Sequence, residues 1–223
     1  MLSTGPRGPW SPERLRDALR LYLVTDQASL RGRPLADVVQ AAVRGGVTCV
    51  QLREKDASSR DFHAQAVMLM ELLAPHGIAL VVNDRVDIAL ACGAQGVHLG
   101  QSDLPLSAAR KLLPPEVFIG WSVETTEHVR QSAALPVDYL GVSPVFATPT
   151  KTDTAPAWEL DGLRQVRSRT ALPLVAIGGI HAGNAAAVLH AGADSLAVVS
   201  AICSADDPCA ASLTLRKLID EHR

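Results

Sequence analysis

The sequence predicts an α/β protein, a single-domain (β/α)8 TIM barrel with a short N-terminal extension. Short β-rich runs alternate with longer helical runs along the chain, and eight such pairs fit within 223 residues. Barrels of this kind routinely reach that length as one domain. Most short runs carry Val, Ile or Leu without clean polar alternation, which is typical of parallel strands covered on both faces. A doubly wound open sheet is the alternative, but no expected strand is followed by GxGxxG or GxxxxGK[ST].

The expected elements follow in order along the chain. The strands are expected at Leu21–Thr25, Thr48–Leu52, Ile78–Asn83, Gly96–Leu99, Phe118–Ser122, Tyr139–Ser143, Leu174–Ile177 and Ser195–Val199. The helices between and after them are expected at Leu35–Arg44, Ser58–His76, Val86–Cys92, Leu106–Leu113, Glu127–Leu135, Leu160–Arg169, Ala182–Ala191 and Pro208–Glu221. Glycines follow several of these helical runs, where a residue with positive φ is favoured. We expect residues 1–20 to form an extension with a short helix near Pro12 to Arg20, and residues 21–223 to form the barrel.

Composition excludes several classes of function. The formal net charge is −2, and no Lys/Arg block or basic–aromatic stripe predicts nucleic-acid binding. No apolar run approaches the ~18 residues of a membrane span, and the first nine residues lack the apolar core of a signal peptide. The four cysteines have no CxxC spacing, which favours buried free thiols over a disulfide or zinc site. We therefore expect a cytoplasmic protein that binds neither nucleic acid nor membrane, and a homo-oligomer is possible.

Polar residues concentrate where the expected strands end, which is where barrel enzymes place their chemistry. The second strand leads into Gln51, Arg53 and Lys55, which the period of two sends to one side. The same ends carry Asn83, Asp84, Asp103 and Ser122 in later units. His98, flanked by Val97 and Leu99, is interpreted as a hydrogen-bonded core histidine rather than a metal ligand.

Asp84 and Asp103 follow adjacent strands and are the candidate metal ligands. Two carboxylates of this kind suit Mg²⁺ that is shared with substrate phosphates. The alternative is that each aspartate caps the helix that follows it, a common role for this residue.

Two further stretches predict anion binding. The segment 145–156 carries four threonines and Lys151, and its hydroxyls and ammonium can hold an oxyanion, although its composition also suits a solvated surface loop. Gly178-Gly179 and Val199-Ser200 follow the seventh and eighth strands, whose loops often bind phosphate through backbone N–H groups. A diphosphate-plus-metal end and a monophosphate end together imply two phosphorylated substrates.

The combination of motifs resembles the thiamine-phosphate synthase family over about Leu21 to Ile202. The resemblance rests on the following elements: Gln51-Leu52-Arg53-Glu54-Lys55, Asn83-Asp84, Gly96–Asp103, the Thr148–Asp153 loop and Ile177–Ile180. It implies a Mg²⁺-dependent transferase that joins 4-amino-5-hydroxymethyl-2-methylpyrimidine diphosphate to 4-methyl-5-(2-hydroxyethyl)thiazole phosphate, with dissociative loss of diphosphate. The products are thiamine phosphate and pyrophosphate.

The same resemblance assigns roles by position in this chain. Gln51 resembles the pyrimidine contact, and Asp84 and Asp103 resemble the Mg²⁺ ligands. The residues that resemble diphosphate contacts are Arg53, Lys55, Asn83, Ser122 and Lys151. The residues that resemble thiazole-phosphate contacts are Thr148, Thr150, Gly179, Val199 and Ser200. Arg53, Lys55, Ser122 and Lys151 are expected to act in catalysis, chiefly by stabilising the departing charge.

Three other functions stay open at this point. A thiazole tautomerase of the same barrel family would not need the full set of diphosphate contacts. A phosphate-sugar isomerase or epimerase barrel would need an acid–base pair or a metal-binding histidine. A non-catalytic barrel that binds a phosphate ligand would need no charged pair beside the anion sites.

Overall fold

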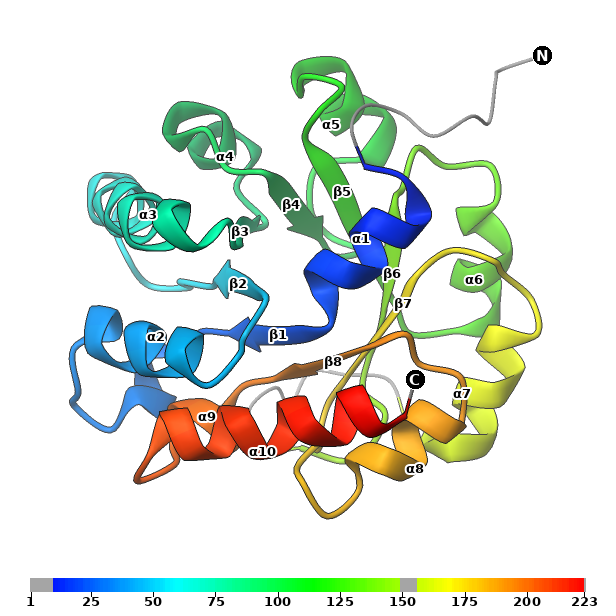
Figure 1. The fold of residues 1–223 in the computed structure, drawn as a ribbon. Coiled ribbons are helices and arrows are strands. Elements are labelled where there is room, and N and C mark those ends of the chain that lie inside the picture. Colours follow the sequence, from blue (N-terminus) through cyan, green and yellow to red (C-terminus); the bar gives the residue numbers. More distant parts are fainter. Residues whose placement is uncertain (1–9, 149–155, 223) are drawn as a thin grey trace.

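The computed structural model describes residues 10–148 and 156–222, and its strands form a closed parallel barrel (Figure 1). The strands are β1 Leu21–Val24, β2 Cys49–Leu52, β3 Ala79–Asn83, β4 Gly96–Leu99, β5 Phe118–Val123, β6 Tyr139–Val142, β7 Leu174–Ile177 and β8 Ser195–Val198. Each strand pairs with its sequence neighbours, and β1 closes the barrel against β8 through the register Tyr22 with Ala197. The predicted barrel is confirmed, and each strand boundary falls at or next to its predicted residue.

Helices surround the barrel in the order expected for βα units (Figure 1). They are α1 Pro12–Leu19, α2 Leu35–Arg44, α3 Ser59–Leu73, α4 Val86–Cys92, α5 Leu106–Leu112, α6 Thr126–Ser132, α7 Glu159–Arg167, α8 Ala185–His190, α9 Ser200–Cys203 and α10 Pro208–Glu221. The helix expected to begin at Ala182 begins three residues later, and the helix expected to end at Leu135 ends at Ser132.

Three short helical turns escaped the sequence prediction. The 3-10 turn η1 covers Gln27–Leu30 and is held by the Asp26 side chain, which accepts hydrogen bonds from the backbone N–H and the hydroxyl of Ser29. The stretch expected as one helix to His76 instead ends as α3 followed by the 3-10 turn η2, Ala74–His76. The single turn α9 begins at Ser200, directly after β8. Such turns bury few apolar residues, so they carry no periodic pattern for a sequence reading to detect.

Strand residues alternate between two apolar layers. Leu21 and Leu23 of β1 belong to the larger core between the sheet and the helices, whereas Tyr22 and Val24 face the barrel interior with the second cluster. The two faces of each strand are therefore both buried, although they contact different partners. This explains why the strands read as nearly continuous apolar runs rather than as polar–apolar alternation.

Large rings fill the barrel interior because glycines on neighbouring strands leave room for them. A Cβ on Gly120 would lie 2.0 Å from Cζ of Tyr139, and a Cβ on Gly141 would lie 2.8 Å from Cε1 of His98. The three glycine–ring pairs are Gly96–Phe118, Gly120–Tyr139 and Gly141–His98. Since real Cβ atoms do not approach other heavy atoms so closely, each ring requires its glycine.

Helix α1 closes the amino-terminal end of the barrel (Figure 1). Its buried Leu15 and Leu19 belong to the interior cluster, and Trp10, just before the helix, packs edge-on against Phe118 with ring centroids 5.1 Å apart. The helix begins at a Ser11 cap whose hydroxyl accepts from the N–H of Arg14. With this end filled, open space in the interior is left toward the carboxyl ends of the strands.

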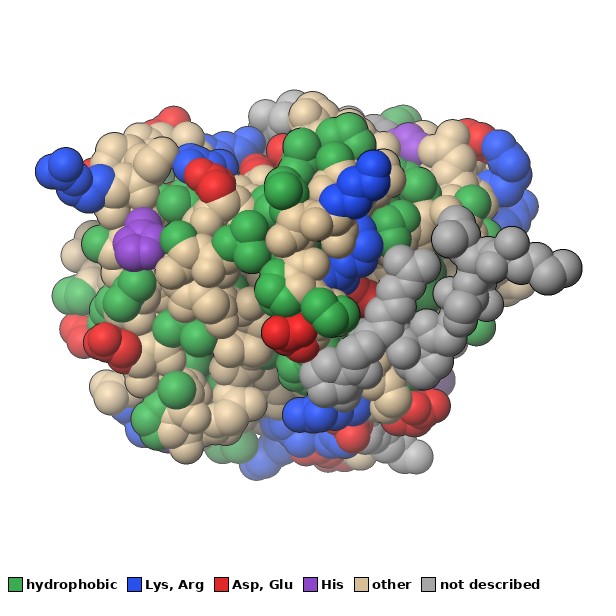
Figure 2. Space-filling model, turned by 90° about the horizontal axis from the view of Figure 1, so that it is seen from above, with side chains coloured by type: hydrophobic (Ala, Val, Ile, Leu, Met, Phe, Trp, Pro, Cys, Tyr) green, Lys and Arg blue, Asp and Glu red, His purple; other side chains and the backbone are tan. Residues whose placement is uncertain are grey.

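The outer surface carries charges of both signs. On the face in Figure 2, Lys and Arg side chains are interspersed with Asp and Glu and with hydrophobic side chains. Among the described residues, the longest helices are too short and too polar for any of them to cross a membrane.

Gly120→Ala tests the requirement for glycine beneath Tyr139. The added methyl has to displace the Tyr139 ring or the β5 backbone, and overpacking of this kind typically costs about 1–3 kcal/mol. For a domain of this size we expect the melting temperature to fall by roughly 2–12 °C.

Gly77→Ala is the matched control, because Gly77 has φ +64° and nothing within 4 Å of an added Cβ. It carries the conformational cost of a positive φ, about 1 kcal/mol, without a clash. A melting temperature for Gly120→Ala above that of Gly77→Ala would contradict the steric argument.

Candidate active site

A cavity of about 560 Å³ opens at the carboxyl ends of the strands. It collects the predicted site residues from seven separate βα units, those of β2 to β8. Those that line it are Gln51, Arg53, Lys55, Asn83, Asp84, Asp103, Ser122, Thr148, Gly179, Val199 and Ser200. The predicted contacts Thr150 and Lys151 lie outside the described residues. The strand-end pattern in the sequence therefore corresponds to one cavity in space.

Arg53 directly follows β2, and two residues that directly follow β1 hold it in place. Its guanidinium lies 3.3 Å from Oδ1 of Asp26, and its backbone N–H donates to the Thr25 hydroxyl at 3.1 Å. Both side chains of the ion pair are largely buried, with 15% and 20% exposure. Asp26 also holds η1 through its other oxygen, so one carboxylate orders the loop and orients the cation. Asp26 was not predicted from the sequence as a site residue, because its partner Arg53 lies 27 residues away along the chain.

Asp84 and Asp103 form a close pair of carboxylates beside two cations. The pKa of Asp84 is raised to about 7, chiefly by burial and further by a hydrogen bond with Asp103 and the repulsion of its charge. Arg53 and Lys55 oppose this shift through their positive charges. Asp84 also adopts a φ of +62°, a left-handed conformation that is uncommon outside glycine but tolerated by Asp and Asn. The backbone conformation and the two nearby cations thus allow two mutually repelling carboxylates to lie together.

Helix capping does not explain these two residues. The cap position of α4 is Arg85 and that of α5 is Pro105, and neither helix has a side-chain cap. Asp103 instead accepts a hydrogen bond from the N–H of Gly100 at 2.6 Å, within its own loop.

The pair fits the chemistry of Mg²⁺. Two hard carboxylate oxygens in an open cavity suit an ion that takes one or two protein carboxylates and completes its shell with water and substrate phosphate. Among residues 10–148 and 156–222, no group of three His, Cys, Asp or Glu side chains forms a fuller metal site.

The glycine pair after β7 approaches the segment after β6. Gly178 and Gly179 have φ values of +105° and +64°, and a Cβ on Gly179 would lie 2.8 Å from Cβ of Phe146. The N–H of Phe146 donates to the Gly178 carbonyl at 3.0 Å, while Asn184 donates to the Gly179 carbonyl at 2.9 Å. These bonds satisfy the carbonyl groups of both glycines.

A chain of hydrogen bonds crosses the floor of the cavity. The Gln51 amide donates to the Tyr22 hydroxyl at 2.8 Å, and the hydroxyls of Tyr22 and Tyr139 lie 3.0 Å apart. His98 contacts the Tyr139 hydroxyl through Nδ1 at 2.8 Å and the Ser122 hydroxyl through Nε2 at 2.9 Å. The interpretation of His98 as a hydrogen-bonded interior residue is confirmed. The roles of Tyr22 and Tyr139 were not predicted. Their side chains point into the barrel, but this direction is equally typical of residues that only pack there.

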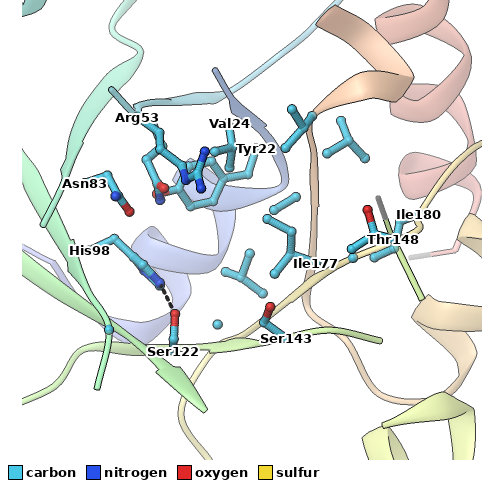
Figure 3. Close-up of a pocket in the computed structure, with 18 of the residues that line it drawn as sticks. Tyr22, Val24, Arg53, Asn83, His98, Ser122, Ser143, Thr148, Ile177 and Ile180 are labelled. Atoms are coloured by element: carbon cyan, nitrogen blue, oxygen red, sulfur yellow. Dashed lines mark hydrogen bonds between the residues drawn. The ribbon is translucent and has the colours of Figure 1, made fainter. Parts of the chain in front are cut away.

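The cavity has a polar side and a more apolar side. Figure 3 shows Arg53, Asn83, His98 and Ser122 on one side, and Ile177, Ile180 and Thr148 on the other. Charged and hydrogen-bonding groups thus gather over β2 to β5, whereas β7 and the segment after β6 contribute the apolar wall. The fold and this site together define a (β/α)8-barrel enzyme whose cavity lies between two unlike walls.

Comparison with known proteins identifies the family. The family model for thiamine monophosphate synthase matches residues 21–202. The thiamine-phosphate synthase of Albidiferax ferrireducens is 75% identical over 203 residues, covering 91% of this chain and 93% of the relative. That of Vibrio parahaemolyticus is 48% identical over 205 residues, covering 92% of this chain and all of the relative. The chain belongs to the thiamine monophosphate synthase family and is a transferase of thiamine biosynthesis.

Solved structures agree with this assignment. The thiamine phosphate pyrophosphorylase of Pyrococcus furiosus superposes with a TM-score of 0.85 at 38% identity, covering 93% of this chain and 98% of the other. The 3-hexulose-6-phosphate synthase of Salmonella typhimurium reaches a TM-score of 0.74 at 16% identity, covering 92% and 100%, and shares the fold alone. The tautomerase and the non-catalytic binder that the sequence left open are not favoured by these relatives.

Asp84→Asn is expected to stabilise the metal-free protein above neutral pH. The folded-state pKa of Asp84 is raised from 3.8 to about 7, so ionisation of this group opposes folding. The wild type therefore loses stability as pH rises from about 4 to about 7, whereas Asn carries no charge and keeps the positive φ. In EDTA, the melting temperature of the variant should exceed that of the wild type by a few degrees at pH 8.

The difference should shrink as pH falls toward about 4, where Asp84 is protonated in both folded and unfolded chains. Thermal unfolding at several pH values measures it. Asp87→Asn is the matched control, since the Arg85 hydrogen bond lowers the pKa of Asp87 and its loss should remove stability at pH 8. A variant at Asp84 that melts below the wild type at pH 8 would contradict the like-charge argument.

Proposed function

We propose that the chain transfers the hydroxymethylpyrimidine group of 4-amino-5-hydroxymethyl-2-methylpyrimidine diphosphate to 4-methyl-5-(2-hydroxyethyl)thiazole phosphate, releasing pyrophosphate. The observation that carries this proposal is the meeting of Arg53 and Lys55 with Asp84 and Asp103 in one cavity. Two cations and two metal-suited carboxylates match a diphosphate better than they match a neutral or singly charged group.

The diphosphate contacts are Arg53, Lys55, Asn83 and Ser122, with Lys151 added from the segment outside the described residues. Arg53 presents a planar fork of donors whose orientation is fixed by Asp26, while Lys55 adds a compact point charge. Asn83 and Ser122 supply neutral donors from β3 and β5. Gln51, at 5% exposure, offers its amide to the pyrimidine ring from the cavity floor.

Asp84 and Asp103 are the proposed ligands of Mg²⁺. When bound, the ion supplies positive charge to the diphosphate oxygens and compensates the repulsion between the two carboxylates. The raised pKa of Asp84 means that a proton competes with the ion below about pH 7. Metal affinity should therefore weaken as the solution becomes acidic.

The reaction needs electrostatic stabilisation rather than a protein nucleophile. The C–O bond to the diphosphate breaks with both electrons leaving on oxygen, and the thiazole nitrogen then donates its lone pair to the resulting pyrimidine methyl cation. Arg53 and Lys55 stabilise the charge that grows on the leaving oxygens. Among the described residues that line the cavity there is no cysteine, and burial raises the pKa of the Cys49 and Cys203 thiols.

The thiazole phosphate is proposed to bind at Gly179, Val199, Ser200 and Thr148, which line the cavity, and at Thr150, which lies outside the described residues. The missing Cβ atoms of Gly178 and Gly179 let this turn pack closely against Pro144 and Phe146, and the turn lines the cavity. Ile177 and Ile180 in the same wall suit the apolar face of a thiazole ring. Opposing walls would bring the two substrates together across the cavity.

The direct test is formation of thiamine phosphate from the two substrates. We expect turnover to require Mg²⁺ and to stop in EDTA. Asp103→Asn should lower kcat by about 10²-fold or more, the scale for loss of one electrostatic stabiliser, while the melting temperature changes little. Chelator-resistant turnover in the wild type and full activity in Asp103→Asn would together remove the metal assignment.

Crossed variants test the two anion sites. Ser122→Ala should raise the KM for the pyrimidine diphosphate, or lower kcat, with little change in the KM for the thiazole phosphate. Ser200→Ala should do the reverse, raising the KM for the thiazole phosphate by about 10-fold, as expected for one hydrogen bond to a charged group. Each variant serves as the control for the other. Equal effects of both variants on both substrates would show that the two sites have been separated wrongly.

A further inference from the structure

The hydrogen bonds on the cavity floor form one continuous chain between two parts of the site. It runs without a break from Gln51 on β2 through Tyr22, Tyr139 and His98 to Ser122 on β5. All five residues line the cavity, and Figure 3 shows the His98–Ser122 link at its polar side. Its two end residues are the groups that the proposed function assigns to the pyrimidine ring and to the diphosphate.

Each interior member of the chain brings a single proton. Burial raises the pKa of Tyr22 and of Tyr139 well above the ordinary value, so both phenols stay neutral with one O–H each. A neutral imidazole likewise carries one N–H. Cys49 lies next to Tyr22 in the register, but burial raises the pKa of its thiol, and a thiol is a weak hydrogen-bond partner.

With one proton per member, the chain has two self-consistent arrangements. In the first, the Gln51 nitrogen donates to Tyr22, Tyr22 donates to Tyr139, Tyr139 donates to Nδ1 of His98, and Nε2–H of His98 donates to Ser122. Gln51 then presents its carbonyl oxygen to the cavity, and Ser122 is left to donate its own proton there. In the second, every bond is reversed, so Gln51 presents N–H groups and the Ser122 proton is used on His98.

We propose that this chain couples recognition of the pyrimidine 4-substituent to recognition of the diphosphate, with Tyr22, Tyr139 and His98 as positioning residues. The inference rests on the proposed function. A 4-amino group donates to the Gln51 oxygen, and this selects the arrangement in which Ser122 donates to the diphosphate. A 4-oxo group accepts, so it selects the reversed arrangement, in which Ser122 has no proton for the diphosphate. The site therefore binds the 4-amino group and the diphosphate cooperatively.

The coupling can be measured with four ligands. These are the 4-amino and the 4-oxo forms of the hydroxymethylpyrimidine, each as the diphosphate and as the free alcohol. Dissociation constants are measured by calorimetry without the thiazole phosphate, at about pH 8, above the ordinary range of imidazole protonation. In the wild type, the preference for amino over oxo should be at least about fivefold larger among the diphosphates than among the alcohols.

Tyr139→Phe breaks the chain but keeps the ring in its place over Gly120. The two halves can then reverse independently, so the ratio of preferences should fall to about one. A purely structural role would weaken all four ligands alike and leave that ratio unchanged. Cys49→Ala is the matched control, since it alters packing beside Tyr22 without removing a link, and it should keep the wild-type ratio.

The outcomes separate this inference from the proposed function. If the wild type forms thiamine phosphate but its amino preference is the same for diphosphates and alcohols, the coupling is wrong and the function stands. If the wild type forms no thiamine phosphate, the proposed function fails whatever the ratio. Should Tyr139→Phe not fold, Tyr22→Phe breaks the chain one bond earlier and should give the same loss, and the wild-type ligand set remains decisive by itself.

Discussion

The contact between the carboxyl groups of Asp84 and Asp103 constrains much of the surrounding structure. Two carboxylates in a partly buried cavity repel each other, and burial disfavours the charge on Asp84. The arrangement persists because Arg53 and Lys55 lie close enough to oppose the shift in pKa. Arg53 in turn is oriented by Asp26, which also orders the first turn after β1. A left-handed φ at Asp84 and a series of compensating charges thus accompany one repulsive pair, as is common where function and stability make opposite demands.

The barrel interior divides into an apolar end and a polar end for a related reason. Toward the amino ends of the strands, α1 and the rings of Phe118 and Trp10 exclude water. Any polar group at middle depth must then find its partner inside the barrel, because an unpaired buried polar group costs about 1–3 kcal/mol. Tyr22 and Tyr139 satisfy this demand by bonding to each other. The polar chain is therefore the boundary between the packed base and the open cavity.

Sequence reasoning recovered the barrel because its signals are local and repeated. Each strand is an apolar run, each helix has its own periodicity, and the carboxyl ends of the strands are known to face one way. The same rule placed the described site residues in one cavity without knowledge of any contact. It could not find Asp26 as the partner of Arg53, nor the chain through Tyr22, Tyr139 and His98. These contacts join residues 27 to 117 positions apart, and their residue types occur as often in packing as in function.

Two glycines show how the local structure of a strand depends on packing inside the whole barrel. Gly120 and Gly141 are weak strand formers, and a local reading treats them as defects in β5 and β6. In the barrel they are the reason that Tyr139 and His98 can lie side by side, 5.5 Å between ring centroids, with their polar atoms in contact. Strand stability at these positions is lower than a β-branched residue would give. The loss is what allows a hydrogen-bonded floor to form beneath the substrates, and the rest of the sheet supplies the stability that these two positions lack.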